Sequence, residues 1–112
     1  MQQIRAGKWI EPMRYEIEYA EGVVEDLAAV RAFRRKSILD AIEEQLAHQP
    51  TEQTRNRKIL VGLVPPWEHV PPVWELRVGQ YRVFYDVGEE RRVVIVRAIR
   101  RKPPHQTTEE VL

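Results

Sequence analysis

Hydrophobic and polar residues alternate through residues 74–87, with one interruption at Gly79-Gln80. The apolar positions are Trp74, Leu76, Val78, Tyr81, Val83, Tyr85 and Val87. A period of two is typical of a β-strand with one face in the core, and a glycine followed by a polar residue favours a tight hairpin turn. Residues 93–96 follow a second turn and are all β-branched, which indicates a strand buried on both faces. Residues 74–102 therefore predict a three-stranded antiparallel meander.

The first half of the chain contains one strand pattern followed by a long helical pattern. Residues 15–20 alternate apolar and acidic side chains, so they predict a strand whose apolar side chains face the core. Those side chains are Tyr15, Ile17 and Tyr19. Between residues 23 and 46 the apolar side chains recur at helical spacing. A basic run predicts that two helices are separated near residues 33–36, and Pro50 ends the second.

These patterns predict an α+β fold with an N-terminal strand, a helical hairpin and the antiparallel meander. The 112 residues provide enough chain for one domain with one core. Residues 1–12 have no periodicity and end at a proline, so we interpret them as a flexible leader. Residues 13–112 are expected to form the single domain.

The loop at residues 65–72 is rich in proline, which excludes regular structure and stiffens the chain. Trp67 within this loop has two interpretations. Its ring either fixes the loop to the core or stands out to stack on a nucleic-acid base. The large apolar area of the indole favours the first interpretation.

Composition restricts the class of protein. The chain has no cysteine, which excludes disulfides and thiolate chemistry and is typical of a reducing cytoplasm. The first residues contain no apolar run as long as that of a signal peptide, and no later segment approaches the length of a membrane span. We therefore expect a cytoplasmic protein without a membrane partner.

The net charge of +1 conceals an asymmetry along the chain. Residues 1–54 contain seven Lys or Arg and ten Asp or Glu, whereas residues 55–105 contain eleven and five. A basic patch built from the second half is typical of a protein that binds nucleic acid.

Arginine is concentrated at the predicted sheet positions. The basic residues of the meander include Arg77, Arg82, Arg92, Arg97, Arg100, Arg101 and Lys102. Long charged side chains are costly in a sheet unless they are solvated or paired. One interpretation is a face that binds a polyanion. The other is a solvated outer face on which Arg77 and Arg82 pair with Glu75 or Asp86.

Motifs for a metal, a cofactor or an activated nucleophile are missing from the sequence. The only serine lies in the helical pattern, no glycine-rich phosphate loop occurs, and the three histidines lack the spacing of metal ligands. We therefore expect neither cofactor nor metal. An enzyme of this composition would take its nucleophile from the substrate, as ribonucleases do with the RNA 2′-hydroxyl. Arginine and one acid or base would then be sufficient.

The order of the predicted elements and four local sequences resemble the RelE/ParE superfamily of toxins from type II toxin–antitoxin systems. The four sequences are YEIEY at residues 15–19, IEEQL at 42–46, TRNRK at 54–58 and WELRVGQYRVFY at 74–85. The resemblance implies a helical hairpin packed on a four-stranded, mainly antiparallel sheet. It also implies a cognate antitoxin as partner, with hetero-oligomers of toxin and antitoxin.

The RelE branch of this superfamily cleaves messenger RNA on the ribosome, and its motif positions suggest a site. Arg82 matches the sheet arginine of that branch, Arg101 matches the arginine after the last strand, and His105 falls where a C-terminal Tyr or His acts. The resemblance thus implies catalytic roles for these three residues. It implies RNA contacts for Arg57, Lys58, Arg77 and Lys102. The chain departs from the pattern at Glu75, Ile99 and Pro103-Pro104.

Three functions follow from the resemblance. The first is a metal-independent, ribosome-dependent endoribonuclease that inhibits translation, with the ribosome and messenger RNA as partners. The second is a ParE-like inhibitor of DNA gyrase, which needs the fold but not His105. The third is an inactive relic that only binds its antitoxin.

Overall fold

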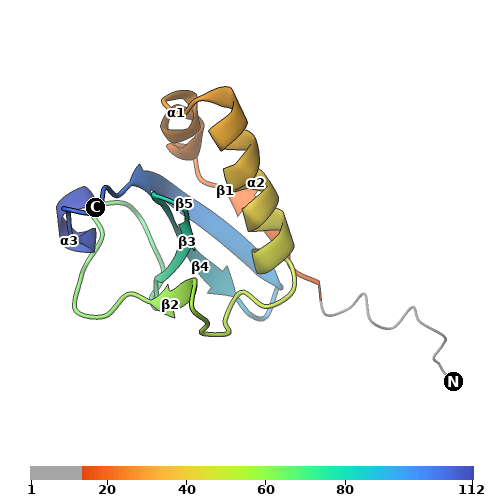
Figure 1. Ribbon diagram of the computed structural model, residues 1–112. Helices are drawn as coiled ribbons and strands as arrows, with labels where there is room; N and C mark the ends of the chain where they lie inside the picture. Colours follow the sequence, from red (N-terminus) through yellow and green to blue (C-terminus); the bar gives the residue numbers. More distant parts are fainter. Residues whose placement is uncertain (1–13) are drawn as a thin grey trace, which may run out of the picture.

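The computed structural model describes residues 14–112, so the expectation of a leader at residues 1–12 and of a domain start at Met13 lies outside the described residues. The strands are β1 (Glu16–Tyr19), β2 (Arg57–Ile59), β3 (Trp74–Val78), β4 (Tyr81–Gly88) and β5 (Val93–Arg101). The helices are α1 (Val23–Ala28), α2 (Ala32–Leu46) and α3 (Thr108–Val111). The α+β class is the one predicted (Figure 1).

The strands form one sheet in the order β1-β5-β4-β3-β2. Strands β3, β4 and β5 form the predicted antiparallel meander, with Val78 opposite Tyr81 across the turn at Gly79. Gly79 has φ +60°, a conformation that glycine adopts without a steric penalty. β1 pairs with β5 in parallel, so β5 is an interior strand, as its run of β-branched residues predicted.

The sheet has five strands instead of the expected four. The additional strand is β2, which pairs antiparallel with β3 and places Arg57 opposite Leu76. β2 is only three residues long and lacks the extended alternation that reveals a strand in a sequence.

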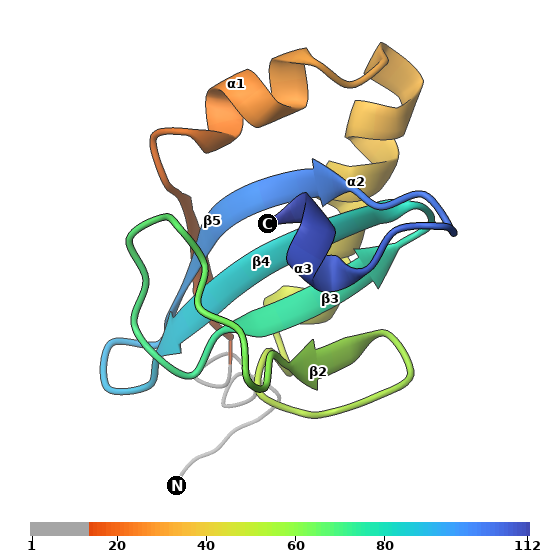
Figure 2. The ribbon, with the colours of Figure 1, turned by 90° about the vertical axis from the view of Figure 1, so that its left-hand side faces the viewer.

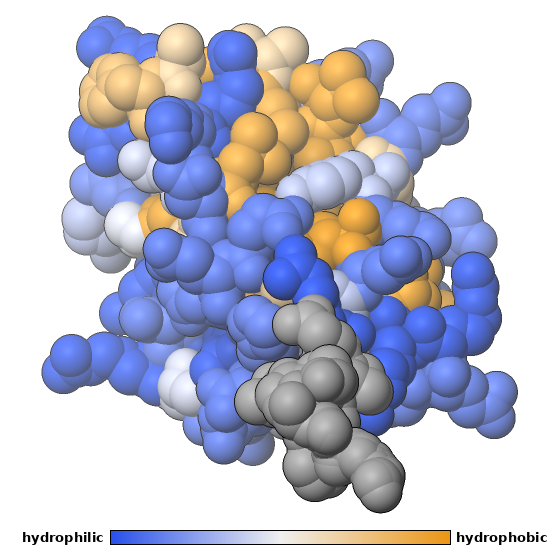
Figure 3. Space-filling model, turned by 90° about the vertical axis from the view of Figure 1, so that its right-hand side faces the viewer, coloured by the Kyte–Doolittle hydropathy of each residue, from blue (hydrophilic) through white to orange (hydrophobic). Residues whose placement is uncertain are grey.

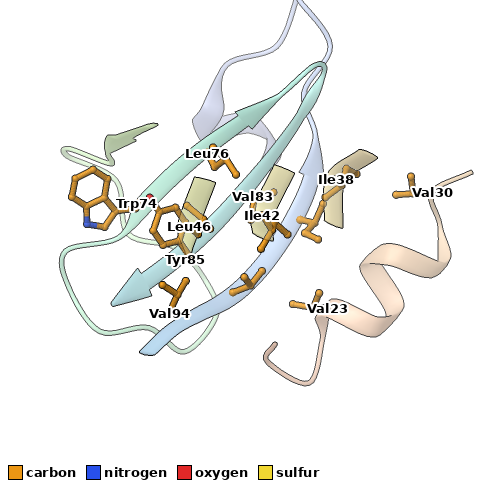
Figure 4. Packing of buried hydrophobic residues seen from close by; sticks show 12 residues of the cluster. Val23, Val30, Ile38, Ile42, Leu46, Trp74, Leu76, Val83, Tyr85 and Val94 are labelled. Carbon is orange, nitrogen blue, oxygen red and sulfur yellow. The ribbon is translucent and has the colours of Figure 1, made fainter. Parts of the chain in front are cut away.

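One face of the sheet, called the helix face below, is covered by α1 and α2 (Figure 1). The main core lies there and joins both helices to β3, β4 and β5 (Figure 4). Ile38, Ile42 and Leu46 of α2 are at most 1% exposed. They are four residues apart, so they form one apolar stripe along the helix that packs into this core. Tyr15 and Ile17 pack against this core as expected, but Tyr19 is 39% exposed.

The opposite face, called the loop face, is covered by residues 60–72 and by α3 (Figure 2). A second cluster forms there around Val73, Phe84 and Ala98, with Trp67 and Leu112 packed against it. The rings of Trp67 and Phe84 lie 5.3 Å apart between centroids. Trp67 therefore fixes the proline-rich loop to the sheet, in agreement with the first interpretation of its role.

The two helices are separated earlier than the sequence predicted. α1 ends at Ala28 and α2 begins at Ala32, so residues 34–36 lie inside the first turns of α2 instead of in a loop. The physical reason is that α2 is exposed along one side, where basic residues are tolerated. Lys36 forms an ion pair with Asp40 one turn later, at 2.8 Å.

A β-bulge in the β4–β5 ladder decides which face each C-terminal arginine takes. Tyr85 lies opposite Val96 and Phe84 lies opposite Ala98, so Arg97 is an extra residue in β5. Before the bulge, even-numbered residues of β5 such as Val96 enter the main core. After the bulge, the odd-numbered Ile99 does so. The alternation is thus shifted by one residue for the end of β5.

Candidate functional site

Arg82 is buried on the loop face in an ion pair with Glu75. Its Nε lies 3.0 Å from Oε2 of Glu75, and the two side chains are only 7% and 4% exposed. Its Nη1 donates hydrogen bonds to the carbonyl oxygens of Gly79 and Tyr81, each at 3.0 Å. The guanidinium therefore ties β3 to β4 and to their turn. This is the cross-strand pair that the sequence allowed as an alternative to catalysis.

The pair is not fully satisfied. Among residues 14–112, neither Oε1 of Glu75 nor Nε of Arg82 has a hydrogen-bond partner, so the 3.0 Å contact is an ion pair without hydrogen-bond geometry. Burial lowers the pKa of Arg82, the nearby Arg77 lowers it further, and Glu75 opposes both effects. The carboxylate of Glu75 thus already binds the Arg82 guanidinium, which a phosphate would need as its partner.

Arg77 and Lys58 share the loop face with this pair, because directly opposite residues of a ladder project to the same side. Arg77 lies opposite Arg82, and Lys58 lies opposite Glu75. Both basic side chains are exposed, and neither forms an ion pair within the described part of the chain. These two predicted RNA contacts are accessible to a ligand.

Arg57 projects to the helix face and is 6% exposed. Its Nη1 donates hydrogen bonds to the carbonyl oxygens of Gln45, at 2.8 Å, and of Gln49. These carbonyls belong to the end of α2 and the turn after it, where helical backbone lacks internal donors. Arg57 therefore stabilises the end of α2, in place of the predicted RNA contact. A three-residue strand gives no sequence signal for the face that each side chain takes.

Arg101 lies on the opposite side of the sheet from Arg82. It is aligned with Tyr81, a residue of the helix face, whereas Arg82 is aligned with Arg100. The exposed Arg101 donates a hydrogen bond from Nη2 to Oε1 of Gln80 at 3.1 Å. The bulge in β5 places Arg101 on this side, because the extra residue Arg97 reverses which face the following side chains take. The two arginines predicted to act on one phosphate are separated by the sheet.

His105 is exposed in the turn between β5 and α3. Within residues 14–112, no hydrogen bond or ion pair joins it to Arg82 or Arg101. Lys102 is half-buried, and its backbone amide donates to the carbonyl of Gln80 at 2.6 Å. The structure therefore does not gather the three predicted catalytic side chains around one point.

Residues 17–102 match the ParE toxin family of type II toxin–antitoxin systems, parDE. The chain belongs to this family. The match covers the helical hairpin and all of the sheet except Glu16, and it includes the four local sequences except the first two residues of the first. The resemblance to the RelE/ParE superfamily is thus confirmed. No curated protein matches the chain.

Solved toxin structures share the fold of this ParE-family chain. The RelBE2 toxin–antitoxin complex of Mycobacterium tuberculosis is 16% identical, with TM-score 0.63, over 80% of this chain and 93% of that one. The RelE–RelB complex of Pyrococcus horikoshii is 21% identical, with TM-score 0.59, over 85% and 100%. The isolated RelE toxin of E. coli is 18% identical, with TM-score 0.60, over 86% and 93%. At sequence identities this low, these structural matches establish a common fold and nothing more.

Several interactions that attach the loop and α1 to the sheet were not predicted from the sequence. Asp86 accepts hydrogen bonds from Arg97 Nε, at 2.9 Å, and from the amide of Val70, at 3.0 Å, which attaches the loop to the sheet. Arg100 lies 5.0 Å from the ring centre of Trp67 and forms an ion pair with Asp26 at 2.9 Å. Arg97 is therefore neutralised by Asp86 within the sheet, and Arg100 by Asp26 from the first half of the chain.

α3 was also absent from the prediction, although the sequence contains a signal for it. Thr107 and Glu110 form a capping box, in which each side chain accepts a hydrogen bond from the other residue's backbone amide. The spacing Thr-x-x-Glu before an apolar pair is visible in the sequence. In the described residues, no group of three His, Asp or Glu side chains is arranged to hold a metal ion. No helix of residues 14–112 has the length and hydropathy needed to cross a membrane.

Proposed function

We propose that this ParE-family chain acts as a toxin by binding DNA gyrase, and that it does not cleave RNA. The observation that carries the proposal is the separation of Arg82 from Arg101 by the sheet, with Arg82 already paired with Glu75. A toxin that inhibits by binding needs the fold and an accessible surface. It has no need for a cluster of catalytic side chains. Such a toxin would act in the cytoplasm, where gyrase and DNA are found.

A ribonuclease mechanism makes stricter geometric demands. A group that stabilises charge must lie about 3 Å from the phosphate oxygens, and an acid or base must reach the same phosphate. Arg82 would have to leave Glu75, and Arg101 would have to reach the same phosphate from the far side of the sheet. The arrangement supports the binding toxin over the messenger RNA interferase that the RelE resemblance implied.

We further propose a cognate antitoxin as partner, docked on the helical hairpin. Figure 3 shows apolar surface gathered in the upper half of this side of the molecule, at the level where Figure 1 places the helices. Val24 and Phe33 are 71% and 62% exposed, and the basic Arg31 lies between the helices. The apolar cluster of the loop face, by contrast, is already covered by residues 60–72 and α3. An amphipathic segment with acidic flanks matches the exposed surface.

The decisive experiment compares two reactions with the purified full chain. We expect inhibition of plasmid supercoiling by gyrase in a dose-dependent manner. We expect that primer extension on a reporter message shows no cleavage on ribosomes. Ribosome-dependent cuts with normal gyrase activity would overturn the proposal and return the function to the endoribonuclease. Inactivity in both assays, together with tight antitoxin binding, would leave a relic that only binds its antitoxin.

Antitoxin binding is tested by its dependence on salt and on the apolar surface. Because charge pairing is screened by salt, affinity should fall as ionic strength rises. Val24→Ser should weaken the complex, whereas Val61→Ser is the matched control, since Val61 is even more exposed than Val24, at 82%, but lies on the loop. If Val61→Ser weakened the complex more than Val24→Ser, the antitoxin would dock on the loop instead.

A further inference from the structure

A cleft on the helix face, at the end of the helical hairpin where α1 connects to α2, collects three arginines from two distant parts of the chain. Its volume is about 330 Å³, and we call it the three-arginine cleft. Its lining residues are Ala29, Arg31, Phe33, Arg34, Gln80, Tyr81 and Arg101. The connection between α1 and α2 supplies one wall, and the β3–β4 turn with the end of β5 supplies the other. The size suits a small ligand or one unit of a polymer.

The arginines of the cleft have no internal anion. No Asp or Glu lines it, and within the described residues none of Arg31, Arg34 and Arg101 forms an ion pair. The adjoining hollow contains two carboxylates, Glu25 and Asp26. Asp26 already binds Arg100 and the amide of Ile99, each at 2.9 Å, and the exposed Glu25 forms no ion pair with the arginines of the cleft within the described residues. This contrasts with Arg82 and Arg97, each of which has a carboxylate partner. Concentrated positive charge without a counterion is repulsive in the free protein and favours an anionic ligand.

Aromatic surface accompanies this charge. Phe33 is 62% exposed, and the guanidinium carbon of Arg34 lies 5.3 Å from its ring centre. Tyr81 is half-buried at the base of the cleft. Guanidinium groups bind phosphate oxygens in a bidentate manner, and an exposed aromatic ring offers a surface on which a base can stack. A peptide with only acidic side chains would use the charge but not the flat ring.

We propose that the three-arginine cleft binds the phosphate of a nucleotide unit, with the base against Phe33. The ligand is a free nucleotide or one residue of a nucleic-acid strand, which present the same chemistry. Arg34 and Arg101 approach the phosphate from opposite walls, and Arg31 adds a third positive charge. The site accounts for Arg101, which the bulge turns away from Arg82. It does not depend on whether the toxin acts on gyrase.

The test is an NMR titration of the full chain, in which the backbone amide signals report binding. The probes are thymidine 5′-monophosphate, thymidine, inorganic phosphate and a capped tetraglutamate peptide. We expect saturable shifts with the monophosphate at residues 29–34, 80 and 101, and none with thymidine. Arg34→Ala and Arg101→Ala should each weaken binding about 10-fold, because a charged hydrogen bond is lost. A labelled thymidine dodecamer then separates strand binding from binding of the free nucleotide.

Two variants serve as controls. Arg91→Ala removes an exposed arginine in the turn before β5, outside the cleft, and should leave the monophosphate affinity unchanged. Phe33→Ala should remove the preference for the monophosphate over inorganic phosphate while leaving phosphate binding intact. Tighter binding of tetraglutamate than of the monophosphate would overturn the proposal in favour of an acidic peptide. Shifts spread over all basic segments, or equal losses in Arg34→Ala and Arg91→Ala, would also overturn it.

Discussion

Replacement of Arg82 by alanine distinguishes a structural arginine from a catalytic one. In the structure Arg82 is the ion-pair partner of Glu75, whose side chain is 4% exposed and whose Oε1 has no hydrogen-bond partner among the described residues. Removal of one member of a buried pair leaves an uncompensated charge and typically costs about 3 to 5 kcal/mol. The two hydrogen bonds from Nη1 to the β3–β4 turn are lost as well. We expect a loss of about 3 kcal/mol or more in the free energy of unfolding.

The assay is urea denaturation followed by tryptophan fluorescence, with the free energy taken from the linear dependence on denaturant. A loss of about 3 kcal/mol is a large part of the stability of a small domain, typically about 5 to 15 kcal/mol. Arg77→Ala is the matched control, since Arg77 lies opposite Arg82 but is exposed. Its effect should stay within about 0.5 kcal/mol.

A double variant separates stability from activity. Arg82→Met combined with Glu75→Leu replaces the pair with apolar side chains, and such exchanges are often neutral or stabilising. We expect recovery to within about 1 kcal/mol of the parent protein, with toxicity retained. The reasoning is refuted if Arg82→Ala leaves stability unchanged. It is also refuted if the stable double variant loses activity about 100-fold, the effect typical of a lost transition-state donor.

Three further substitutions test contacts that position the site. Tyr85→Phe should cost about 1 to 2 kcal/mol near pH 7, because the buried Tyr85 hydroxyl donates to the carbonyl of Pro50 at 2.6 Å. Burial raises the pKa of Tyr85 far above 10, so this contribution is complete below pH 10 and is lost as pH rises. The stability difference between parent and variant should therefore shrink by about 1.4 kcal/mol per pH unit above pH 10 in denaturation curves. Arg57→Ala should cost about 2 kcal/mol in urea denaturation and expose the end of α2 to hydrogen exchange, since a charged donor to two carbonyls is removed. Trp67→Ala should increase proteolysis within residues 60–72 and lower the melting temperature, because the contacts with Phe84 and Arg100 are lost. An unchanged cleavage pattern would show that other contacts fix the loop.

The elements with long, regular patterns were predictable from the sequence. The alternation from Trp74 onward and the turn at Gly79 identify the β3–β4 hairpin, because pleated strands and their turns leave a local signature. The β-branched run of β5 identifies an interior strand for the same reason. The separation between α1 and α2 was misplaced, because basic residues are compatible both with a loop and with the exposed side of a helix. Local sequence does not distinguish those surroundings.

The roles of the charged residues depended on partners that are distant in the sequence. Arg57 reaches carbonyls of residues 45 and 49 only because β2 adds to the sheet edge beneath the end of α2. Arg100 meets Asp26, which lies 74 residues earlier. From the sequence, these side chains were predicted to belong to a basic patch. The fold instead uses them as internal ion pairs and caps, which a local pattern cannot reveal.

The bulge at Arg97 shows how one backbone irregularity changes a functional site. With regular alternation continuing from Val94 and Val96, residues 98 and 100 would face the helices, and Arg101 would share the face of Arg82. The extra residue reverses this order. Ala98 joins the loop-face cluster, Ile99 joins the main core, and Arg101 enters the three-arginine cleft. Residues 93–96 are apolar at odd and even positions alike, so the sequence contains no local sign of this reversal. The alternation of this one strand therefore decides on which face of the sheet Arg101 lies.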